Sequence, residues 1–471
     1  MVMNHHCMRK ITYQSFQSIT NELFERLIMT QTEGLCRNQI SNQQFLFSKT
    51  TPIVKSDQPD PSEFISIQAV KEKFPKILIE NTFLDAAMAH VVNSKRFSTM
   101  VIRIDDISFV INPDNMMADL AEAIDGICRE QSGVWGLFNH YLVGCVFTET
   151  TQKSCLKIAE QLMRTLAELR METVSIGIAV YPTISYKKND IFENAKKALD
   201  HAEFFGVNSC VAFDSVSLNI SGDKYYQAGD IDKAIDEFLL ALELDKDNVN
   251  VHNSLGVCYG IKGDMDKALN EFETAAGLDP KEIMPVYNAG YVHFLNKKYA
   301  TALDYFLKAE QIDDTVFELA VQTGRIYLEL NQIKTAKKYL ENAIALNRKS
   351  AVAYRLLGDA YTLLDQISDA ITAYKTSLKI NPDGAHSLSS LGYLYEIKKK
   401  NADIALMFCR QSTQLDPHNG LFRQRLGQLY LNRKQIQKAL DEFQQAKELG
   451  HKSDEYIAKA LKLMSSQKAG S

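Results

Sequence analysis

The chain has 471 residues, of which 45% are hydrophobic and 24% are charged. This length exceeds one compact core, so we expect two or three domains, or one domain joined to an elongated array. A net charge of −5, from 53 basic and 58 acidic side chains, argues against nucleic acid as a partner and against an anionic membrane surface. No stretch approaches the roughly 20 uninterrupted apolar residues that a membrane span needs.

The eight cysteines are scattered without a CxxC pair, and no histidine stands at the spacing of a metal ligand. The N-terminal stretch lacks the apolar core of a secretory signal. We therefore expect a reducing, cytoplasmic location and neither a metal nor another cofactor. We interpret His5, His6 and Cys7 as incidental neighbours, the alternative being a metal site on the terminus.

The region 1–35 contains a stretch, 11–30, with apolar residues on one helical stripe. A helix of this kind needs a partner. Packing on the next domain is the simpler interpretation, and the alternative is an oligomerisation or docking helix. Residues 36–63 are rich in Gln, Asn, Ser and Pro and predict a linker.

Helical and β-rich segments alternate over residues 64–214. One polar pair, Asn139-His140, marks the tip of an expected hairpin at 133–147. This order predicts an α+β domain with a ferredoxin-like sheet. The other expected elements are helices at 83–92, 116–129, 152–170 and 190–204, and strands at 100–106, 173–182 and 208–214.

Beyond Asp214 similar residues recur every 34 positions, with a 35-residue step before the last unit. Each glycine of the series is followed by a tyrosine or histidine, then by an alanine, and then by a larger residue. The small residues let two antiparallel helices approach closely, and we expect the aromatic residues to fill the gap between one helix pair and the next. The glycines are Gly222, Gly256, Gly290, Gly324, Gly358, Gly392 and Gly427, and the larger residues are Phe238, Phe272, Phe306, Leu340, Tyr374, Cys409 and Phe443.

This period and these residue types resemble tetratricopeptide repeats. The resemblance implies seven repeats over residues 215–452, with a capping helix and tail at 453–471. The fold class expected for the whole chain is therefore α+β followed by all-α, an α-solenoid.

The block before the repeats resembles GGDEF-type diguanylate cyclase domains over about residues 75–214. The stretches VSIGIAVYP (174–182) and ENAKKALDHAEFFGVNSCVAFD (193–214) are similar to the closing strand and final helix of that family. MVIRIDDISFVIN (100–112) is similar to its first core strand, and WGLFNHYLVGCVF stands at its signature hairpin. The resemblance implies a cyclase-like palm fold; active members join two GTP molecules, using carboxylates for a divalent metal and cations for the triphosphate.

The motif residues of an active cyclase are largely replaced. The first strand keeps one acid, Asp105, whereas the second aligns with Ile107. A phosphate-contacting lysine of the family aligns with Glu203 and an arginine with Val207, so a carboxylate would face the phosphate charge. No aspartate follows Arg129 at the spacing of the product-binding motif. The signature hairpin aligns with Leu137, Phe138, Asn139, His140 and Tyr141, of which only the last matches.

These departures predict a degenerate domain without catalytic residues. Leu137 and Phe138 put bulk where two glycines admit the nucleotide. Asp105 then ends a strand and Asn139 suits the hairpin turn. The alternative is a nucleotide or metal site rebuilt from Asp105, Asn139 and His140.

In tetratricopeptide proteins the first helices of the pairs line a concave groove, which implies a protein partner bound there. The lysine and asparagine set that clamps a peptide's terminal carboxylate is not present in order. The aromatic group Tyr287, Tyr291 and Phe294 either anchors a partner or packs between repeats. The expected groove residues are Asn219, Asp223, Asn253, Tyr287, Tyr291, Phe294, Arg325, Arg355, Tyr393 and Gln424.

The sequence thus predicts a non-enzymatic scaffold or adaptor in bacterial signalling, with an inactive cyclase-like domain as a structural or docking module. The alternative is a divergent nucleotide-binding or diguanylate cyclase domain that the repeats regulate. A homo-oligomer, formed through the N-terminal helix or the cyclase-like domain, is a further alternative.

Overall fold

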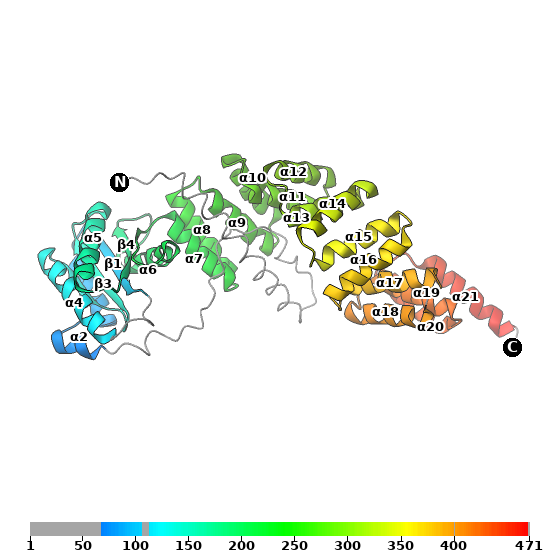
Figure 1. The fold of residues 1–471 in the computed structure, drawn as a ribbon, viewed down its shortest axis with the longest axis horizontal. Coiled ribbons are helices and arrows are strands. Elements are labelled where there is room, and N and C mark those ends of the chain that lie inside the picture. Colours follow the sequence, from blue (N-terminus) through cyan, green and yellow to red (C-terminus); the bar gives the residue numbers. More distant parts are fainter. Residues whose placement is uncertain (1–66, 106–112, 400, 470–471) are drawn as a thin grey trace. The chain divides into compact units, whose positions relative to one another are not determined.

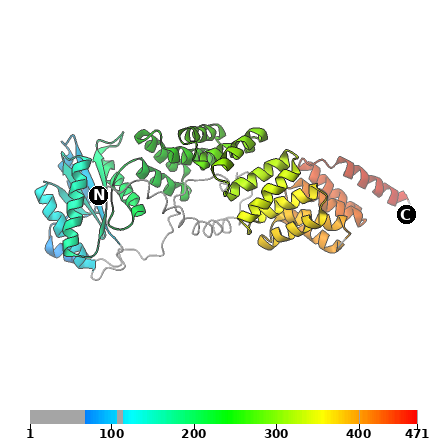
Figure 2. The same ribbon diagram turned by 45° about the horizontal axis from the view of Figure 1, so that its top comes forward.

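The computed structural model describes residues 67–105, 113–399 and 401–469. They form two compact units, divided between Pro280 and Lys281, whose elements are labelled in Figure 1 and seen again in Figure 2. The expected N-terminal helix, the linker and the group His5, His6 and Cys7 lie outside these residues. Among the helices described, none is both long and apolar enough to cross a membrane.

The first unit begins with a five-stranded sheet in the order β2-β3-β1-β4-β5. Strand β1 lies antiparallel to β3 and to β4, and β4 lies parallel to β5. Each helix and strand expected between residues 83 and 214 forms within a few residues of its expected bounds. The elements are α2 (Gln68–Lys73), α3 (Asn81–Val91), β1 (Phe97–Ile104), α4 (Pro113–Glu130), β2 (Val134–Leu137), β3 (Leu142–Thr148), α5 (Gln152–Leu169), β4 (Val174–Tyr181), α6 (Ile191–Ala202) and β5 (Cys210–Ala212).

Two apolar cores enclose this sheet, one on each face. Buried residues of α4 and α5 pack with Ile102 and Ile176 on one face. Buried residues of α3 and α6 pack with Val101 and Ala179 on the other. Successive strand residues therefore point into opposite cores, which explains why β1 and β4 read as nearly continuous apolar runs.

Helix α6 packs both on the sheet and on the first helix pair, α7 (Ser215–Gln227) and α8 (Ile231–Leu244). Its Lys197 forms a 2.6 Å ion pair with Glu237 of α8, and both side chains are mostly buried. Asp200 of α6 forms a second ion pair, also of 2.6 Å, with Lys224 of α7. Because these contacts join α6 to both helices of the first pair, the sheet and that pair form one packed body.

Seven consecutive helix pairs follow the sheet, two in the first unit and five in the second. A last helix, α21 (Asp454–Ala469), packs on the seventh pair, where Tyr456 stacks on Phe443 with ring centres 5.3 Å apart. The pairs are α7 (Ser215–Gln227) with α8 (Ile231–Leu244), α9 (Val249–Lys262) with α10 (Met265–Leu278), α11 (Ile283–Leu295) with α12 (Tyr299–Ile312), α13 (Phe317–Glu329) with α14 (Ile333–Leu346), α15 (Ala351–Leu363) with α16 (Ile367–Ile380), α17 (Ala385–Ile397) with α18 (Ala402–Leu415), and α19 (Gly420–Asn432) with α20 (Ile436–Glu448).

The periodic glycines mark the closest approach within each pair. A Cβ at Gly222 would lie 2.4 Å from the ring of Phe238, and one at Gly358 would lie 2.7 Å from the ring of Tyr374. These rings share buried clusters with residues of the next pair, as expected: Phe238 with Leu255 of α9, and Tyr374 with Leu391 of α17. They also fill the space within their own pair. They sit against the glycine of their own pair, where the missing side chain leaves room for them.

The turn inside each pair also repeats. One of its residues has a left-handed backbone, with φ of 81° at Gly229 and 58° at Asn331. Left-handed geometry costs little for glycine and is tolerated by asparagine and aspartate. The equivalent residues are Gly229, Gly263, Lys297, Asn331, Asp365, Lys399 and Lys434.

Gly177 of β4 offers a test of the packing of α6 on the sheet. A Cβ there would lie 2.0 Å from the backbone oxygen of Ala195, so Gly177→Ala should lower the free energy of unfolding of the first unit by about 3 kcal/mol. Trp135, the only tryptophan of the chain, lies in β2 and reports this unfolding by its fluorescence in urea.

Gly126→Ala in α4 is the matched control, because nothing lies within 4 Å of a Cβ there. Alanine should raise the stability at this exposed helical position by about 1 kcal/mol. Equal stability of the two variants would contradict the packing described.

Candidate functional site

Three of the expected groove residues lie in the first unit. Asn219 and Asp223 belong to α7 and Asn253 to α9, and their exposed fractions are 6%, 2% and 1%. Burial raises the pKa of Tyr226 and of Cys258 to about 12, and the nearby charge of Asp223 adds to both shifts. These three residues are buried polar side chains of the first two pairs, separate from the expected residues of the second unit.

The expected aromatic group forms a continuous stack on α11. The rings of Tyr287 and Tyr291 are parallel with centres 6.3 Å apart, and Tyr287 also stacks on Phe306 of α12 at 5.3 Å. Burial raises the pKa of Tyr291 to about 12. Phe294 continues the stack, and the guanidinium of Arg325 lies over its ring at 4.9 Å. The stacking of Tyr287 on Phe306 favours the interpretation that this aromatic group serves packing. The ring of Phe294, in contrast, is also in contact with the guanidinium of Arg325.

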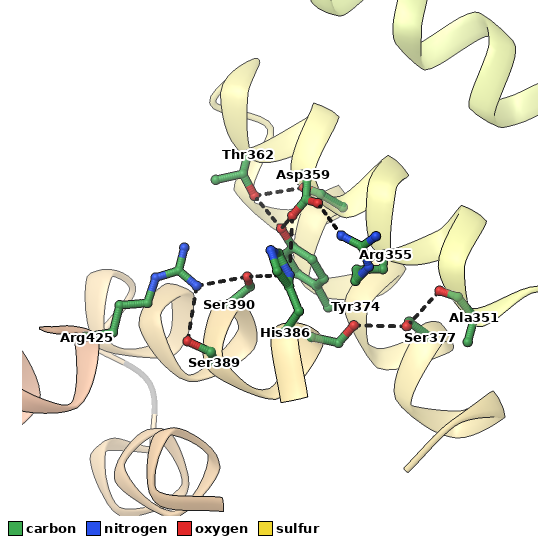
Figure 3. Close-up of polar contacts among 12 residues, drawn as sticks. Ala351, Arg355, Asp359, Thr362, Tyr374, Ser377, His386, Ser389, Ser390 and Arg425 are labelled. Carbon is green, nitrogen blue, oxygen red and sulfur yellow. Dashed lines mark hydrogen bonds and ion pairs between the residues drawn. The ribbon is translucent and has the colours of Figure 1, made fainter. Parts of the chain in front are cut away.

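A network of polar side chains occupies the facing helices α15, α16 and α17, with Asp359 at its centre (Figure 3). Arg355 donates from Nη1 to one carboxylate oxygen of Asp359 at 3.1 Å. The hydroxyl of Tyr374 donates to the other oxygen at 2.6 Å, and Nδ1 of His386 lies 3.8 Å from that oxygen. Asp359 thus holds together one side chain from each of its two neighbouring helices and one from its own.

Arg425 of α19 closes the far side of the network. Its Nη1 donates to the hydroxyls of Ser389 and Ser390 on α17, at 3.2 and 3.0 Å. Its guanidinium lies over the ring of Tyr393 at 5.2 Å. The first helices of three successive pairs are therefore linked through polar contacts (Figure 3).

Burial is the largest cause of the pKa shifts of His386 and Arg355 in this network. Burial and the guanidinium groups of Arg355 and Arg425 hold the pKa of His386 below its usual value, although Asp359 opposes them. Burial also lowers the pKa of Arg355, and the charge of Arg325 adds to this effect while Asp359 opposes it. First helices of the second unit thus bring several cationic groups close to the carboxylate of Asp359.

Sequence reasoning missed Asp359, His386 and Arg425. The register of the repeats could have found Asp359, because it follows its periodic glycine directly, as do the expected residues Arg325 and Tyr393. Gln424 is engaged elsewhere: its amide donates to the backbone oxygen of Lys452 at 2.8 Å and so anchors the approach to α21.

In the sheet, the aligned signature hairpin is closed by its own side chains. Oδ1 of Asn139 accepts hydrogen bonds from the backbone of Tyr141 and Leu142, at 3.0 and 2.9 Å. Leu137 is fully buried, and the ring of Phe138 packs edge-on against Phe83 at 5.2 Å. The hairpin tip therefore serves the core and the turn.

Two charged residues of the aligned motif also have partners inside the domain. The carboxylate of Asp105 accepts hydrogen bonds from Thr173, Ser175 and the backbone of Asn208, all between 2.6 and 2.7 Å. Glu203 forms a 2.5 Å ion pair with Arg103 of β1. No group of three potential metal ligands comes together within the part of the chain that the structure describes.

Two family models match parts of this chain. One, described as a TPR repeat, matches residues 222–263 and 358–398, and the other, described as a tetratricopeptide repeat, matches residues 249–282 and 318–350. The C-terminal part of the chain therefore contains tetratricopeptide repeats. No curated protein sequence matches the chain significantly.

Several solved structures resemble parts of the chain. PilF of Pseudomonas aeruginosa is 22% identical over 44% of this chain and 95% of its own, with a TM-score of 0.41. A tetratricopeptide repeat protein of Parabacteroides merdae is 18% identical over 53% of this chain and 98% of its own, with a TM-score of 0.42. YrrB, described as having an unusual peptide-binding site, is 23% identical over 39% of this chain and 95% of its own, with a TM-score of 0.34.

The hydrogen bond between Tyr374 and Asp359 should stabilise the second unit. Tyr374→Phe keeps the ring against Gly358 and removes a donor to a half-buried carboxylate, so it should lower the free energy of unfolding by about 2 kcal/mol. Circular dichroism during thermal unfolding measures this loss.

Tyr299→Phe is the control, since no hydrogen bond of that hydroxyl is found among the described residues. It should leave the transition unchanged within about 0.5 kcal/mol. If both substitutions changed the free energy of unfolding equally, the hydrogen bond from Tyr374 to Asp359 would not stabilise the second unit.

Proposed function

We propose that the chain is a non-enzymatic scaffold that binds a partner protein through the concave face of its tetratricopeptide repeats. The observation that carries this proposal is the row of partly exposed side chains on first helices of the second unit, including Arg325, Arg355 and Tyr393. Repeats of this kind present an extended surface along which a peptide or helix can lie. Aromatic and arginine side chains contribute much of the energy of protein interfaces.

We also propose that the sheet is a degenerate cyclase-like domain. Its β1, β2, β3 and β4, with α4 and α5 as the two connecting helices, follow the split βαβ arrangement of a ferredoxin-like sheet. Strand β3 lies between β2 and β1, and β1 lies between β3 and β4, all antiparallel. This topology supports the resemblance stated from the sequence.

The contacts at the aligned motif favour a structural role for this domain. Three donors already occupy the carboxylate of Asp105, and Glu203 places a negative charge where a phosphate would need a cation. Bulk at Leu137 and Phe138 belongs to the core. The pairing of such a domain with repeats supports a docking role in bacterial signalling, in the reducing interior of the cell.

A random peptide library panned on the full-length chain tests the binding proposal. Selected peptides should lose about tenfold in affinity when Tyr393→Ala removes an aromatic contact of the concave face. Lys338→Ala, an exposed position on the second helix α14, should change nothing. Selected peptides that bind both variants equally would contradict a concave binding site.

Titration with GTP and magnesium tests the degenerate domain. We expect no saturable heat of binding and no dinucleotide product, because the aligned acids are engaged or replaced. Trp135 fluorescence confirms that the domain remains folded in each sample. Saturable binding that Asp105→Ala abolishes would favour the alternative, a divergent nucleotide-binding domain regulated by the repeats.

A further inference from the structure

Two arginines of the second unit are half-buried and have no carboxylate partner among the residues that the structure describes. Arg325 on α13 lies over Phe294, and Arg425 on α19 lies over Tyr393, with two serine hydroxyls as its only other contacts among the described residues. A guanidinium withdrawn from water loses solvation that a neutral ring and hydroxyls replace only in part. A carboxylate of a partner would compensate for this lost solvation.

Three other arginines of the same unit are paired with a carboxylate. Arg355 is held by Asp359, Arg423 by Glu442 at 3.1 Å, and Arg433 by Asp403 at 3.2 Å. Arg410 on α18 also lies over a ring, that of Tyr430, but its side chain is exposed. The half-buried arginines of this unit without a carboxylate among the described residues are therefore Arg325 and Arg425, both on first helices of their pairs. First helices are those that line the concave face.

Geometry leaves these two guanidinium groups able to bind a carboxylate. Each lies with its carbon over the face of a ring, an arrangement in which a guanidinium can keep donors at its edge free for a planar acceptor. Only Nη1 of Arg425 donates to Ser389 and Ser390 (Figure 3), so its other nitrogens retain donors. A guanidinium can donate two parallel hydrogen bonds to one carboxylate.

The surrounding charges favour the same ligand. Arg325 lies close enough to Arg355 for their like charges to interact, and the charges of Arg355 and Arg425 both disfavour the protonated form of His386. Asp359 offsets part of this charge, and Glu318 at the start of α13 is a further acid of this face. The arginines of this face stand beside Asp359 and Glu318, an arrangement that differs from the long cationic track that nucleic acid requires.

We propose that the concave face of the second unit recognises an acidic, extended segment of a partner protein, whose carboxylates pair with Arg325 and Arg425. This inference rests on the proposed function and names the chemistry of its ligand. Ring stacking fixes each guanidinium in advance, so the partner pays little ordering entropy for these contacts.

The probe is a short fluorescein-labelled peptide that alternates glutamate with leucine, compared with the same peptide carrying glutamine. Fluorescence anisotropy with the full-length chain should show about tenfold tighter binding of the acidic peptide at low ionic strength. The advantage should shrink at high ionic strength, because salt screens exposed charges.

Arg325→Gln and Arg425→Gln should each weaken the binding of the acidic peptide by about threefold, half of its advantage in free energy, and leave the binding of the glutamine peptide unchanged. Lys338→Gln removes a charge on the second helix α14 and should leave both peptides unchanged. Arg425→Lys keeps the charge but loses the planar guanidinium, so its affinity for the acidic peptide should lie between those of wild type and Arg425→Gln. Unchanged thermal transitions in circular dichroism show that the variants remain folded.

The inference would be overturned if the two peptides bound with equal affinity, or if neither arginine substitution changed the affinity for the acidic peptide. Its failure is distinct from that of the proposed function. Library peptides without acidic residues that still depend on Tyr393 would refute the acidic ligand and leave the concave binding site standing. Peptides that depend on neither Tyr393 nor the arginines would refute both.

Discussion

Close approach of two helices at a glycine is the contact on which the repeats depend. In six of the seven pairs a ring or leucine of the second helix occupies the space that a side chain on the glycine would fill, as Phe238 does at Gly222 and Phe443 at Gly427. The sixth pair uses the sulfur of Cys409 at Gly392 in the same way. Since one face of every first helix is committed to this contact, the remaining positions of the helix are left for neighbouring pairs and for the concave face.

Side chains on the concave face are consequently free of the packing constraint, and they carry the chemistry of the second unit. Positions directly after the glycine hold Arg325, Asp359 and Tyr393 in successive pairs. The carboxylate of Asp359 contacts Arg355, Tyr374 and His386. The guanidinium groups of Arg325 and Arg425 instead lie over aromatic rings. A rigid scaffold of helix pairs thus presents cations whose orientation is fixed before a ligand arrives. Preorganised groups of this kind bind at a smaller entropic cost.

Much of this architecture could be predicted from the sequence, because the spacing of glycines, alanines and rings reports local helix packing. The sheet elements were also predictable, since β1 and β4 are apolar runs between helices of ordinary period. The positions of Asp359, His386 and Arg425 relative to one another were not, because residues far apart in sequence meet only when pairs stack. The burial of Tyr287 against Phe306 and the anchoring of Gln424 on Lys452 likewise depend on three-dimensional packing. Alignment alone gave Asp105 and Asn139 as polar residues, and only the structure supplies their hydrogen-bond donors.

Hydrogen–deuterium exchange on the full-length chain, with and without the acidic peptide, tests the central claim most directly. The account predicts slower exchange in α13, α15 and α19, whose side chains meet the ligand, because binding raises the free energy of local opening there. Exchange in the hairpin of β2 and β3 and in the second helix α14 should stay the same. Protection confined to the sheet, or spread equally over first and second helices, would contradict a concave site for an acidic partner.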